Sequence, residues 1–449
     1  MIDRSTFRGL TAHFHTFGCK LNFAETSSVA RMLAERGIVR AQRGDRPDLV
    51  VVNTCSVTEL ADKKCRQAIR SMARRWPGVP IAVTGCYAQL KSSEVASLPG
   101  VAIVAGSDMK GKLADFIDRF LDERKPMLEV NPTAEIRSFT PSCERGDRTR
   151  WLLKVQDGCD YYCTYCTIPF ARGRSRSPMI GDLVDQARHA AANGAVEIVL
   201  TGVNIGDFGR RNGQTFLQLI EQLDKVEGIE RYRISSIEPN LLTDETIDFV
   251  AASRRFMPHF HVPLQSGSDE VLRLMHRHYD TALFRERMEH IRRAIPDAFI
   301  GVDLIVGARG ETDELFERSK AFVESLDISR LHVFPYSERP GTKALSIDGM
   351  VDPAVRHRRA AVMIALSERK LDNFAARFTG QTRPVLIEHT RRRDGEYDLM
   401  SGHTDNYLRV EIPFDRSLAN TITECRLTLD GTPGIGSDGV MNARINLKL

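Results

Sequence analysis

Apolar runs and amphipathic stretches alternate along the first 130 residues of the chain. The apolar runs are short and rich in β-branched or aromatic side chains, which predicts strands, whereas the stretches between them have the period of a helix. The predicted strands are 13–17, 48–53, 80–84 and 101–105, and the predicted helices are 23–36, 57–73 and 112–121. Such alternation predicts a parallel sheet with helices on its faces. We therefore predict an N-terminal α/β domain over residues 11–130.

The same alternation continues over residues 150–377. Six units of strand and helix predict a partial (β/α)6 barrel, in which the chemistry lies on the loops that follow the strands. Those loops are polar and rich in glycine here. Residues 131–149, which precede this domain, are rich in proline, serine and charge and predict a linker. The predicted strands are 151–156, 196–200, 231–235, 259–264, 299–306 and 330–335.

The pattern changes after a predicted helix at 354–378. Short strand patterns punctuated by glycine and proline follow at 383–388, 407–412 and 425–429. They predict a small OB-like β-barrel over residues 378–447. The fold class is therefore α/β, with two α/β domains and a C-terminal β-barrel.

Composition narrows the possible functions. The formal net charge of the 449-residue chain is +4, so a nucleic-acid site would be a local patch. The N-terminus has no apolar signal core, and no run approaches the roughly 18 apolar residues of a membrane span. Nine cysteines, an odd number, argue against a disulfide framework and favour metal or redox chemistry in a reducing compartment. We predict a soluble, cytoplasmic protein.

Cys159, Cys163 and Cys166, the central triad, follow the first strand of the central domain with C-x3-C-x2-C spacing. Thiolates at such spacing select zinc or an iron–sulfur cluster. A closed zinc site needs four ligands, and no fourth Cys or His is close, because the neighbours along the chain are Cys143 and His189. Three ligands on a four-iron cluster leave one iron free for another molecule. A zinc knuckle is the alternative.

A second set, the N-terminal triad, consists of Cys19, Cys55 and Cys86, each of which directly follows a predicted strand. The carboxyl ends of parallel strands meet at one edge, so the three thiols are predicted to converge on a second cluster. Three separate buried cysteines are the alternative. The remaining cysteines, which are given no ligand role, are Cys65, Cys143 and Cys425.

The central triad, with Tyr165 before its third cysteine, resembles the signature of radical S-adenosylmethionine (SAM) enzymes. Both triads together resemble the radical-SAM methylthiotransferases, and the resemblance covers nearly the whole chain. It implies two [4Fe–4S] clusters, SAM bound at the central one, and an electron donor such as a flavodoxin or ferredoxin. It also implies that SAM is cleaved to a 5′-deoxyadenosyl radical, that sulfur is carried at the N-terminal cluster, and that another SAM supplies the methyl group. No side-chain acid or base leads this chemistry.

SAM needs backbone groups for its adenine, acceptors for its ribose hydroxyls, and partners for its carboxylate and amine. The strand ends offer candidates, for which ordinary loop polarity is the alternative: Thr201, Gly202, Ser235, Glu238 and Gln265. The segments 275–279 and 339–342 also match the family. In the segment 307–312, by contrast, Ala308-Arg309 stands where the family usually has Phe-Pro.

Two further patterns have several interpretations. Arg172, Arg174 and Arg176 follow the central triad, where they could raise the reduction potential of a cluster, hold RNA phosphates, or form a solvated loop. Three His-x-His pairs also occur, two on predicted strands and the third, His276 and His278, on a predicted helix. We interpret all of them as core or surface histidines.

The substrate is predicted from resemblance. Segments 383–388 and 402–407 resemble the TRAM domain, an RNA-binding barrel, although acids and bases nearly balance there. The stretch 53–70 resembles the branch that acts on N6-threonylcarbamoyladenosine (t6A) in tRNA. This predicts methylthiolation of t6A at position 37, 3′ of the anticodon. The alternatives are isopentenyladenosine in tRNA, an aspartate of a ribosomal protein, and a non-enzymatic, zinc-stabilised RNA-binding protein.

Overall fold

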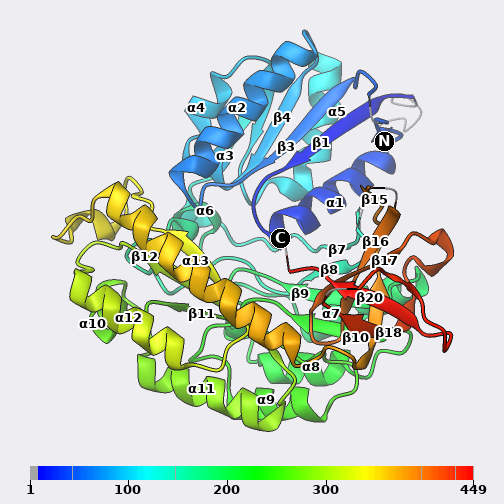
Figure 1. The fold of residues 1–449 in the computed structure, drawn as a ribbon. Coiled ribbons are helices and arrows are strands. Elements are labelled where there is room, and N and C mark those ends of the chain that lie inside the picture. Colours follow the sequence, from blue (N-terminus) through cyan, green and yellow to red (C-terminus); the bar gives the residue numbers. More distant parts are fainter. Residues whose placement is uncertain (1–8, 43, 147, 396, 430, 448–449) are drawn as a thin grey trace.

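The computed structural model describes residues 9–42, 44–146, 148–395, 397–429 and 431–447 (Figure 1). Its N-terminal part is a parallel sheet of six strands in the order β2-β1-β3-β4-β5-β6. The strands are β1 (Thr11–Thr16), β2 (Val39–Arg40), β3 (Leu49–Thr54), β4 (Ile81–Gly85), β5 (Val101–Ala105) and β6 (Met127–Glu129). The helices are α1 (Lys20–Ala34), α2 (Glu59–Arg75), α3 (Cys86–Leu90), α4 (Ser92–Ala96), η1 (Lys110–Lys112) and α5 (Leu113–Glu123).

Helices cover both faces of this sheet, as the alternating pattern predicts. Leu49 and Val51 of β3 pack in one core with α1 and α5, whereas Val50 and Val52 pack in a second core with α2. All of β3 is therefore buried, as in parallel sheets generally. The predicted elements are all present, with ends shifted by at most three residues. The sequence did not predict β2 and β6, because so few residues form no recognisable pattern.

The prediction of a linker at 131–149 is wrong for part of that stretch. Cys143 and Glu144 form β7, which pairs antiparallel with the first central strand, and the Cys143 side chain is buried. A short helix, η2 (Thr133–Glu135), lies upstream. Polar composition hid these elements, because each is too short to have a hydrophobic period.

The central part contains all six predicted strands, and their order in space follows the sequence. Two sheets share them, β10-β9-β8-β7 and β11-β12-β13, and an isolated parallel bridge between Ser236 and His261 joins the two. The strands are β8 (Trp151–Lys154), β9 (Glu197–Thr201), β10 (Arg231–Ile234), β11 (His259–Gln265), β12 (Phe299–Val306) and β13 (Arg330–Pro335). The helices are α6 (Ile168–Arg172), α7 (Ile180–Ala192), α8 (Phe216–Leu223), α9 (Asp244–Ala252), α10 (Asp269–Leu274), α11 (Thr281–Ala294), α12 (Asp313–Ser325) and α13 (Pro353–Ala376), with the short turns η3 (Ile205–Asp207) and η4 (Lys343–Ser346).

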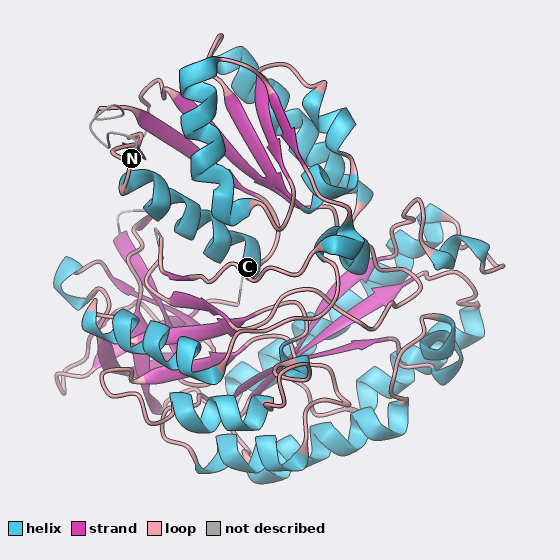
Figure 2. Cartoon of the chain, turned by 180° about the vertical axis from the view of Figure 1, so that it is seen from behind, coloured by secondary structure: helices cyan, strands magenta, loops and turns pink. Residues whose placement is uncertain are grey.

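Helices lie along the outer face of these strands (Figure 2), and the opposite face is the lumen face. Alternate strand residues such as Val302 and Leu304 pack against the helices in the largest core. The residues between them therefore point to the lumen. Helix α1 of the N-terminal part covers one side of the lumen, where Ala24 packs on Leu152 and Val199. Polar residues on the lumen face include Lys154, Glu197, Arg233, His261, Asp303 and His332.

The C-terminal part is a closed barrel of five strands, which confirms the predicted small β-barrel. Its ladder runs β14-β18-β20-β17-β16 and closes by pairing β16 with β14. The sequence did not predict strands β15, β16, β19 and β20. The strands are β14 (Thr382–Ile387), β15 (Arg392–Asp394), β16 (Tyr397–Thr404), β17 (Arg409–Pro413), β18 (Ile422–Thr428), β19 (Gly434–Ile435) and β20 (Met441–Ile445), with the turn η5 (Arg416–Leu418).

The barrel is attached to the central strands through the segments that resemble TRAM. Arg233 donates hydrogen bonds of 2.8 Å to the carbonyls of Thr404 and Asp405. The ring of Tyr407 packs against that of His259 in a tilted arrangement, with ring centroids 4.1 Å apart. Arg231, the first residue of β10, also donates to the carbonyls of Pro384 and His403, and His259 is the first residue of β11. The barrel thus lies at the amino-terminal ends of these strands, opposite the loops that carry the central triad.

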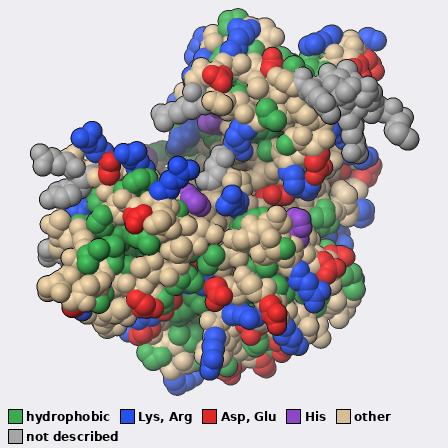
Figure 3. All heavy atoms as spheres, turned by 90° about the vertical axis from the view of Figure 1, so that its right-hand side faces the viewer, with side chains coloured by type: hydrophobic (Ala, Val, Ile, Leu, Met, Phe, Trp, Pro, Cys, Tyr) green, Lys and Arg blue, Asp and Glu red, His purple; other side chains and the backbone are tan. Residues whose placement is uncertain are grey.

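The surface shows no field of a single sign on the face drawn in Figure 3, where Lys and Arg side chains are mixed with Asp and Glu. This agrees with the formal net charge of +4. None of the helices described by the structure is long and apolar enough to cross a membrane.

Candidate active site

The loop that carries the central triad begins just beyond β8 and folds back on itself. Gly158 has a φ of +72°, and a Cβ there would lie 2.1 Å from the carbonyl oxygen of Arg174, so only glycine fits. The backbone N–H of Cys159 donates to Gly173. Backbone N–H groups also point at two of the sulfurs, from Tyr161 to Cys159 at 3.5 Å and from Ile168 to Cys166 at 3.4 Å. Donors of this kind stabilise negative charge on ligand sulfurs.

Arg277 is a neighbour of the triad that the sequence analysis did not single out. Its guanidinium donates to the Cys163 sulfur at 3.0 Å and to the Glu238 carboxylate. Burial raises the pKa of Glu238, and the charge of Arg277 opposes that shift. Arg277 lies past the end of α10, as do His276 and His278, so the prediction that this histidine pair lies on a helix is wrong. The family-like segment 275–279 thus connects a cysteine with a predicted SAM contact.

The residues of the N-terminal triad lie directly after three neighbouring strands, as predicted. Cys19 precedes α1, Cys55 follows β3, and Cys86 begins α3 after β4. A Cβ on Gly18 would lie 2.9 Å from the Cys55 sulfur, so the backbone before Cys19 approaches that thiol closely. The three thiols influence one another electrostatically. The structure therefore brings them to one edge of the sheet.

The loops that carry the two triads meet at the junction between the N-terminal and central parts. The Thr167 hydroxyl, next to Cys166, donates to the carbonyl of Ser56, next to Cys55, at 3.1 Å. Arg339 donates to the Ser56 hydroxyl at 2.8 Å and forms a 2.9 Å ion pair with Asp62. Arg339 belongs to the second family-like segment, 339–342. The loops that hold the two triads are thus in direct contact.

The donor chemistry of both triads fits an iron–sulfur cluster. Burial raises the pKa of Cys55 and that of Cys159 to about 12, so metal binding would be needed to make them thiolates at neutral pH. Within the described residues, no group of three or more His, Cys, Asp or Glu side chains could hold a metal ion as it stands. In a four-iron cluster, however, each thiolate binds a different iron. Each triad thus supplies thiols for three of the four irons of such a cluster.

Known proteins match the chain over both of these regions. Residues 11–106 match Uncharacterized protein family UPF0004, and residues 153–323 match the Radical SAM superfamily. Threonylcarbamoyladenosine tRNA methylthiotransferase MtaB of Bacillus subtilis (strain 168) is 37% identical over 94% of this chain and 95% of its own. The chain belongs to the radical-SAM methylthiotransferase family. Membership implies SAM and a [4Fe–4S] cluster as cofactors.

Other relatives of this methylthiotransferase carry two different names. The MtaB protein of Aquifex aeolicus is 34% identical, over 84% of this chain and 93% of its own. A tRNA-2-methylthio-N(6)-dimethylallyladenosine synthase of Thermobifida fusca is 35% identical, over 91% and 84%. Among solved structures, the radical SAM methyltransferase TsrM of Kitasatospora setae is similar, with a TM-score of 0.56 over 75% of this chain and 77% of its own. At 15% identity, that similarity concerns the fold alone.

The predicted SAM contacts lie at the carboxyl ends of the central strands of the methylthiotransferase. Thr201 ends β9 and Gln265 ends β11, while Ser235 directly follows β10. Parallel strands place these ends on the edge that carries the central triad. Gly202 lies where a Cβ would come within 2.9 Å of the Gln156 carbonyl oxygen, so a side chain is excluded there. Glu238 lies nearby, but Arg277 engages its carboxylate.

Arg309, which departs from the family pattern, is anchored in the structure. Its guanidinium pairs with Glu338 at 3.1 Å and donates to the carbonyls of Leu345 and Ile347. These contacts attach the loop after β12 to the segment that follows β13. The departure thus adds tethers to the loop and does not disturb Glu311, which accepts from the backbone of Gly307 at 2.7 Å.

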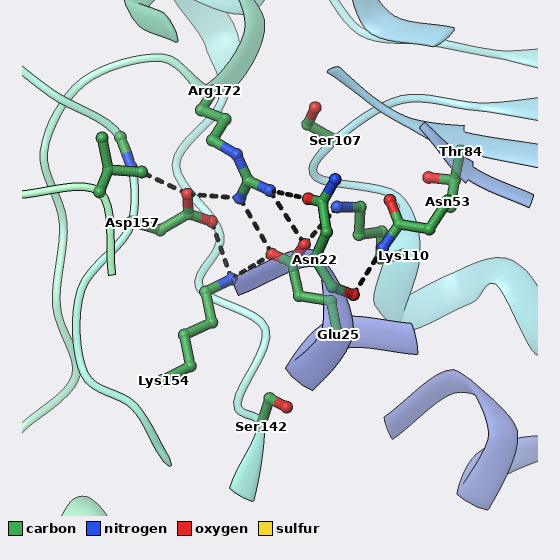
Figure 4. A network of polar contacts seen from close by, with 12 residues as sticks. Asn22, Glu25, Asn53, Thr84, Ser107, Lys110, Ser142, Lys154, Asp157 and Arg172 are labelled. Carbon is green, nitrogen blue, oxygen red and sulfur yellow. Dashed lines mark hydrogen bonds and ion pairs between the residues drawn. The ribbon is translucent and has the colours of Figure 1, made fainter. Parts of the chain in front are cut away.

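A buried network of charges connects the same two parts of the molecule (Figure 4). Glu25 of α1 pairs with Lys110, with Lys154 at 2.9 Å and with Arg172 at 3.0 Å. Asp157, two residues before Cys159, pairs with Lys154 at 2.8 Å and with Arg172 at 2.9 Å. These cations hold the pKa of the Glu25 carboxyl and that of the Asp157 carboxyl far below their usual range, against the cost of burial.

This network decides between the interpretations of Arg172, Arg174 and Arg176. Arg172 is fully buried, and Arg176 is largely buried and pairs with Asp157 at 2.9 Å. Neither is a solvated loop residue, and neither is free to hold phosphate. Arg174 alone of the three is exposed. Arg172 also acts on the pKa of Cys19, so its charge reaches the N-terminal triad.

Replacing Glu25 by Gln is expected to lower the free energy of unfolding by about 3–5 kcal/mol, because it leaves buried cations uncompensated. Lys110 is the most affected, since Glu25 is its ion-pair partner and both side chains are at most 2% exposed. The measurement is urea denaturation of the apoprotein. Glu35→Gln is the matched control: Glu35 is 59% exposed, and its pair with Arg31 is worth about 0–1 kcal/mol. Equal effects of the two substitutions would contradict this account of the network.

Proposed function

We propose that this methylthiotransferase converts t6A at position 37 of tRNA into its 2-methylthio derivative. The observation that carries the proposal is the contact between the loops of the two cysteine triads, from Thr167 to Ser56. A methylthio transfer needs a site that activates the substrate carbon and a site that holds sulfur, close to each other. The relatives from Bacillus subtilis and Aquifex aeolicus, whose names specify threonylcarbamoyladenosine in tRNA, support this choice of substrate.

The proposal assigns a separate role to each triad. The central triad, Cys159, Cys163 and Cys166, holds the [4Fe–4S] cluster at which SAM binds, and Arg277 donates a hydrogen bond to one of its sulfurs. The N-terminal triad, Cys19, Cys55 and Cys86, holds a second [4Fe–4S] cluster, at which sulfur is kept. When bound, the central cluster and SAM supply a radical that removes hydrogen from the substrate carbon.

Residues at the strand ends orient SAM in this proposal. Ser235 and Gln265, both largely buried, offer side-chain hydrogen bonds to its polar groups. The Thr201 hydroxyl does the same, and Gly202 lets SAM approach the backbone. Glu238, held by Arg277, presents its remaining acceptor capacity to the amine of SAM. An electron donor such as a flavodoxin or ferredoxin completes the system, and a tRNA substrate sets the reaction in the cytoplasm.

Isopentenyladenosine in tRNA is a second candidate substrate. The relative from Thermobifida fusca, named for dimethylallyladenosine, is 35% identical to the chain. The modified groups of the two nucleosides differ in charge, because the threonylcarbamoyl group ends in a carboxylate and the isopentenyl group is apolar. A positively charged side chain near the bound nucleoside would therefore favour t6A over isopentenyladenosine.

The test is mass spectrometry of tRNA nucleosides from cells that lack the gene. We expect 2-methylthio-t6A to disappear and t6A to accumulate, and a plasmid that encodes the intact chain should reverse both changes. Selective loss of methylthiolated isopentenyladenosine would move the assignment to the second candidate. Unchanged methylthiolated nucleosides would overturn the tRNA proposal.

A further inference from the structure

A polar cluster lies on the lumen face of β11, β12 and β13. His261 Nε2 is 2.7 Å from Asp303 Oδ1, and the rings of His261 and His332 lie 5.1 Å apart. The side chains of His261 and Asp303 remain 23% and 20% exposed, so the cluster is open to the lumen. Gly301, which pairs with His261 across the strands, leaves room beside His332, because a Cβ there would lie 3.7 Å from its Nε2. Three neighbouring strands thus present hydrogen-bonding groups to one space.

Lys20 faces the same space from the other side. It begins α1 four residues before Ala24, so the two side chains share a face of the helix. Ala24 packs on Leu152 and Val199 of the lumen face, which directs Lys20 into the lumen. Lys20 directly follows Cys19 of the N-terminal triad in the sequence. A ligand held by Lys20 would therefore lie beside the sulfur site.

Electrostatics agree with this placement. Burial lowers the pKa of His332 to about 4, and the charge of Lys20 is among the further causes, so the ring is neutral at pH 7. Burial raises the pKa of Tyr407, but charges led by that of Lys20 outweigh it and bring the pKa to about 8. Lys20 thus acts on groups from β13 and from the C-terminal barrel, both of which border the lumen.

Lys20 has no acidic partner. Among the described residues, its side chain takes part in no ion pair or hydrogen bond. The acids of the lumen face are already paired, Glu197 with Arg233 at 2.8 Å and Asp303 with His261. A half-buried ammonium without a counter-ion favours an anionic ligand, because a carboxylate would restore the hydrogen bonds and charge balance that burial removes.

We propose that Lys20, together with His332 and His261, binds the carboxylate of the threonylcarbamoyl group of the substrate. This inference rests on the proposed function and adds the residue that decides between its two candidate substrates. Lys20 supplies the charge, and the neutral His332 ring supplies a hydrogen bond. An isopentenyl group has no charge or hydrogen-bond acceptor with which the Lys20 ammonium could pair. A site that binds a polar group rejects a ligand without that group.

The experiment compares two anticodon stem-loop RNAs on the reconstituted, full-length enzyme. One carries t6A, and the other carries t6A whose carboxylate is converted to a carboxamide, which removes the charge and keeps the shape. Wild type should bind the carboxylate RNA roughly 10- to 100-fold more tightly, the range of one charge-assisted hydrogen bond. In Lys20→Gln this preference should vanish through weaker binding of the carboxylate RNA alone. Lys20→Arg should restore most of it.

Controls separate this inference from the proposed function. Lys225→Gln removes an exposed lysine and should keep the wild-type preference. Iron and sulfide content, and SAM cleavage without RNA, should be the same in Lys20→Gln as in wild type. Should Lys20→Gln lose its clusters, His332→Leu tests the same site, with a smaller loss of preference expected. A Lys20→Gln enzyme that still prefers the carboxylate overturns the inference alone, whereas a wild type that methylthiolates neither RNA overturns the proposed function.

Discussion

An enzyme in which Cys159, Cys163 and Cys166 are all replaced by alanine should lose SAM cleavage completely and about half of its iron. Thiolates are the ligands of such clusters, and no other cysteine can substitute. Cys143, which lies in β7, is buried and packs into the core of the central part. The measurements are iron and sulfide content after anaerobic reconstitution, and 5′-deoxyadenosine formed with a chemical reductant.

The matched control replaces the three cysteines outside the triads, Cys65, Cys143 and Cys425, with alanine. All three are buried, and a buried free cysteine behaves as a small apolar side chain. We expect this control to keep its iron and its SAM cleavage, at some cost in stability. Full iron and normal 5′-deoxyadenosine in the variant of the central triad would show that the radical cluster is held elsewhere.

The fold could be predicted wherever the hydrophobic period was long enough. The bounds of β12 and β13 agree with the predicted runs, because each strand alternates a helix-facing apolar residue with a lumen-facing one over six or more positions. β7 has two residues and leaves no such pattern. β16 is long, but it contains Gly402, where a Cβ would lie 2.6 Å from Val385 of the paired strand. Close packing in the barrel therefore requires a glycine at position 402, and glycine in a sequence pattern predicts a turn instead of a strand.

Only part of the candidate site could likewise be predicted from the sequence. The convergence of Cys19, Cys55 and Cys86 could be predicted, because strand ends are visible in the local pattern and the alternation of strands and helices predicts parallel pairing. The charged network could not, since Glu25 and Arg172 are 147 residues apart and each resembles an ordinary surface charge in sequence. Arg277 lies in the family-like segment 275–279, yet its role is clear only from its contacts with Cys163 and Glu238 in the structure.

The resemblance to an RNA-binding domain identifies the C-terminal barrel, but it does not identify the surface that would bind RNA. The segments 383–388 and 402–407, which resemble an RNA-binding domain, include Arg383 and Tyr407 and face the central part. Arg383 pairs with Asp297 at 2.8 Å, and Tyr407 is wedged between His259 and Phe299. Any RNA contact by the barrel must therefore use its other faces, among which β15 carries the exposed Arg392 and Arg393.

Replacing Cys19, Cys55 and Cys86 together by alanine should separate the two halves of the reaction. The variant should still cleave SAM, because the central triad is held by contacts of its own, among them Gly158 against Arg174 and Arg277 to Cys163. It should insert no sulfur, and methylthiolated product should fall below detection. The measurements are 5′-deoxyadenosine and modified nucleoside from one reaction with t6A-containing RNA.

The arrangement of the two loops makes this separation a demanding test. Ser56 and Thr167 meet directly, so loss of the N-terminal cluster could disturb the central loop by distorting the contact. Thr167→Val removes that hydrogen bond and leaves every cysteine in place, which makes it the control for such a disturbance. If Thr167→Val and the triple variant lose SAM cleavage alike, the loss reflects the contact between the loops. If the triple variant makes methylthiolated product at a normal rate, sulfur comes from another source and the role assigned to the N-terminal triad is wrong.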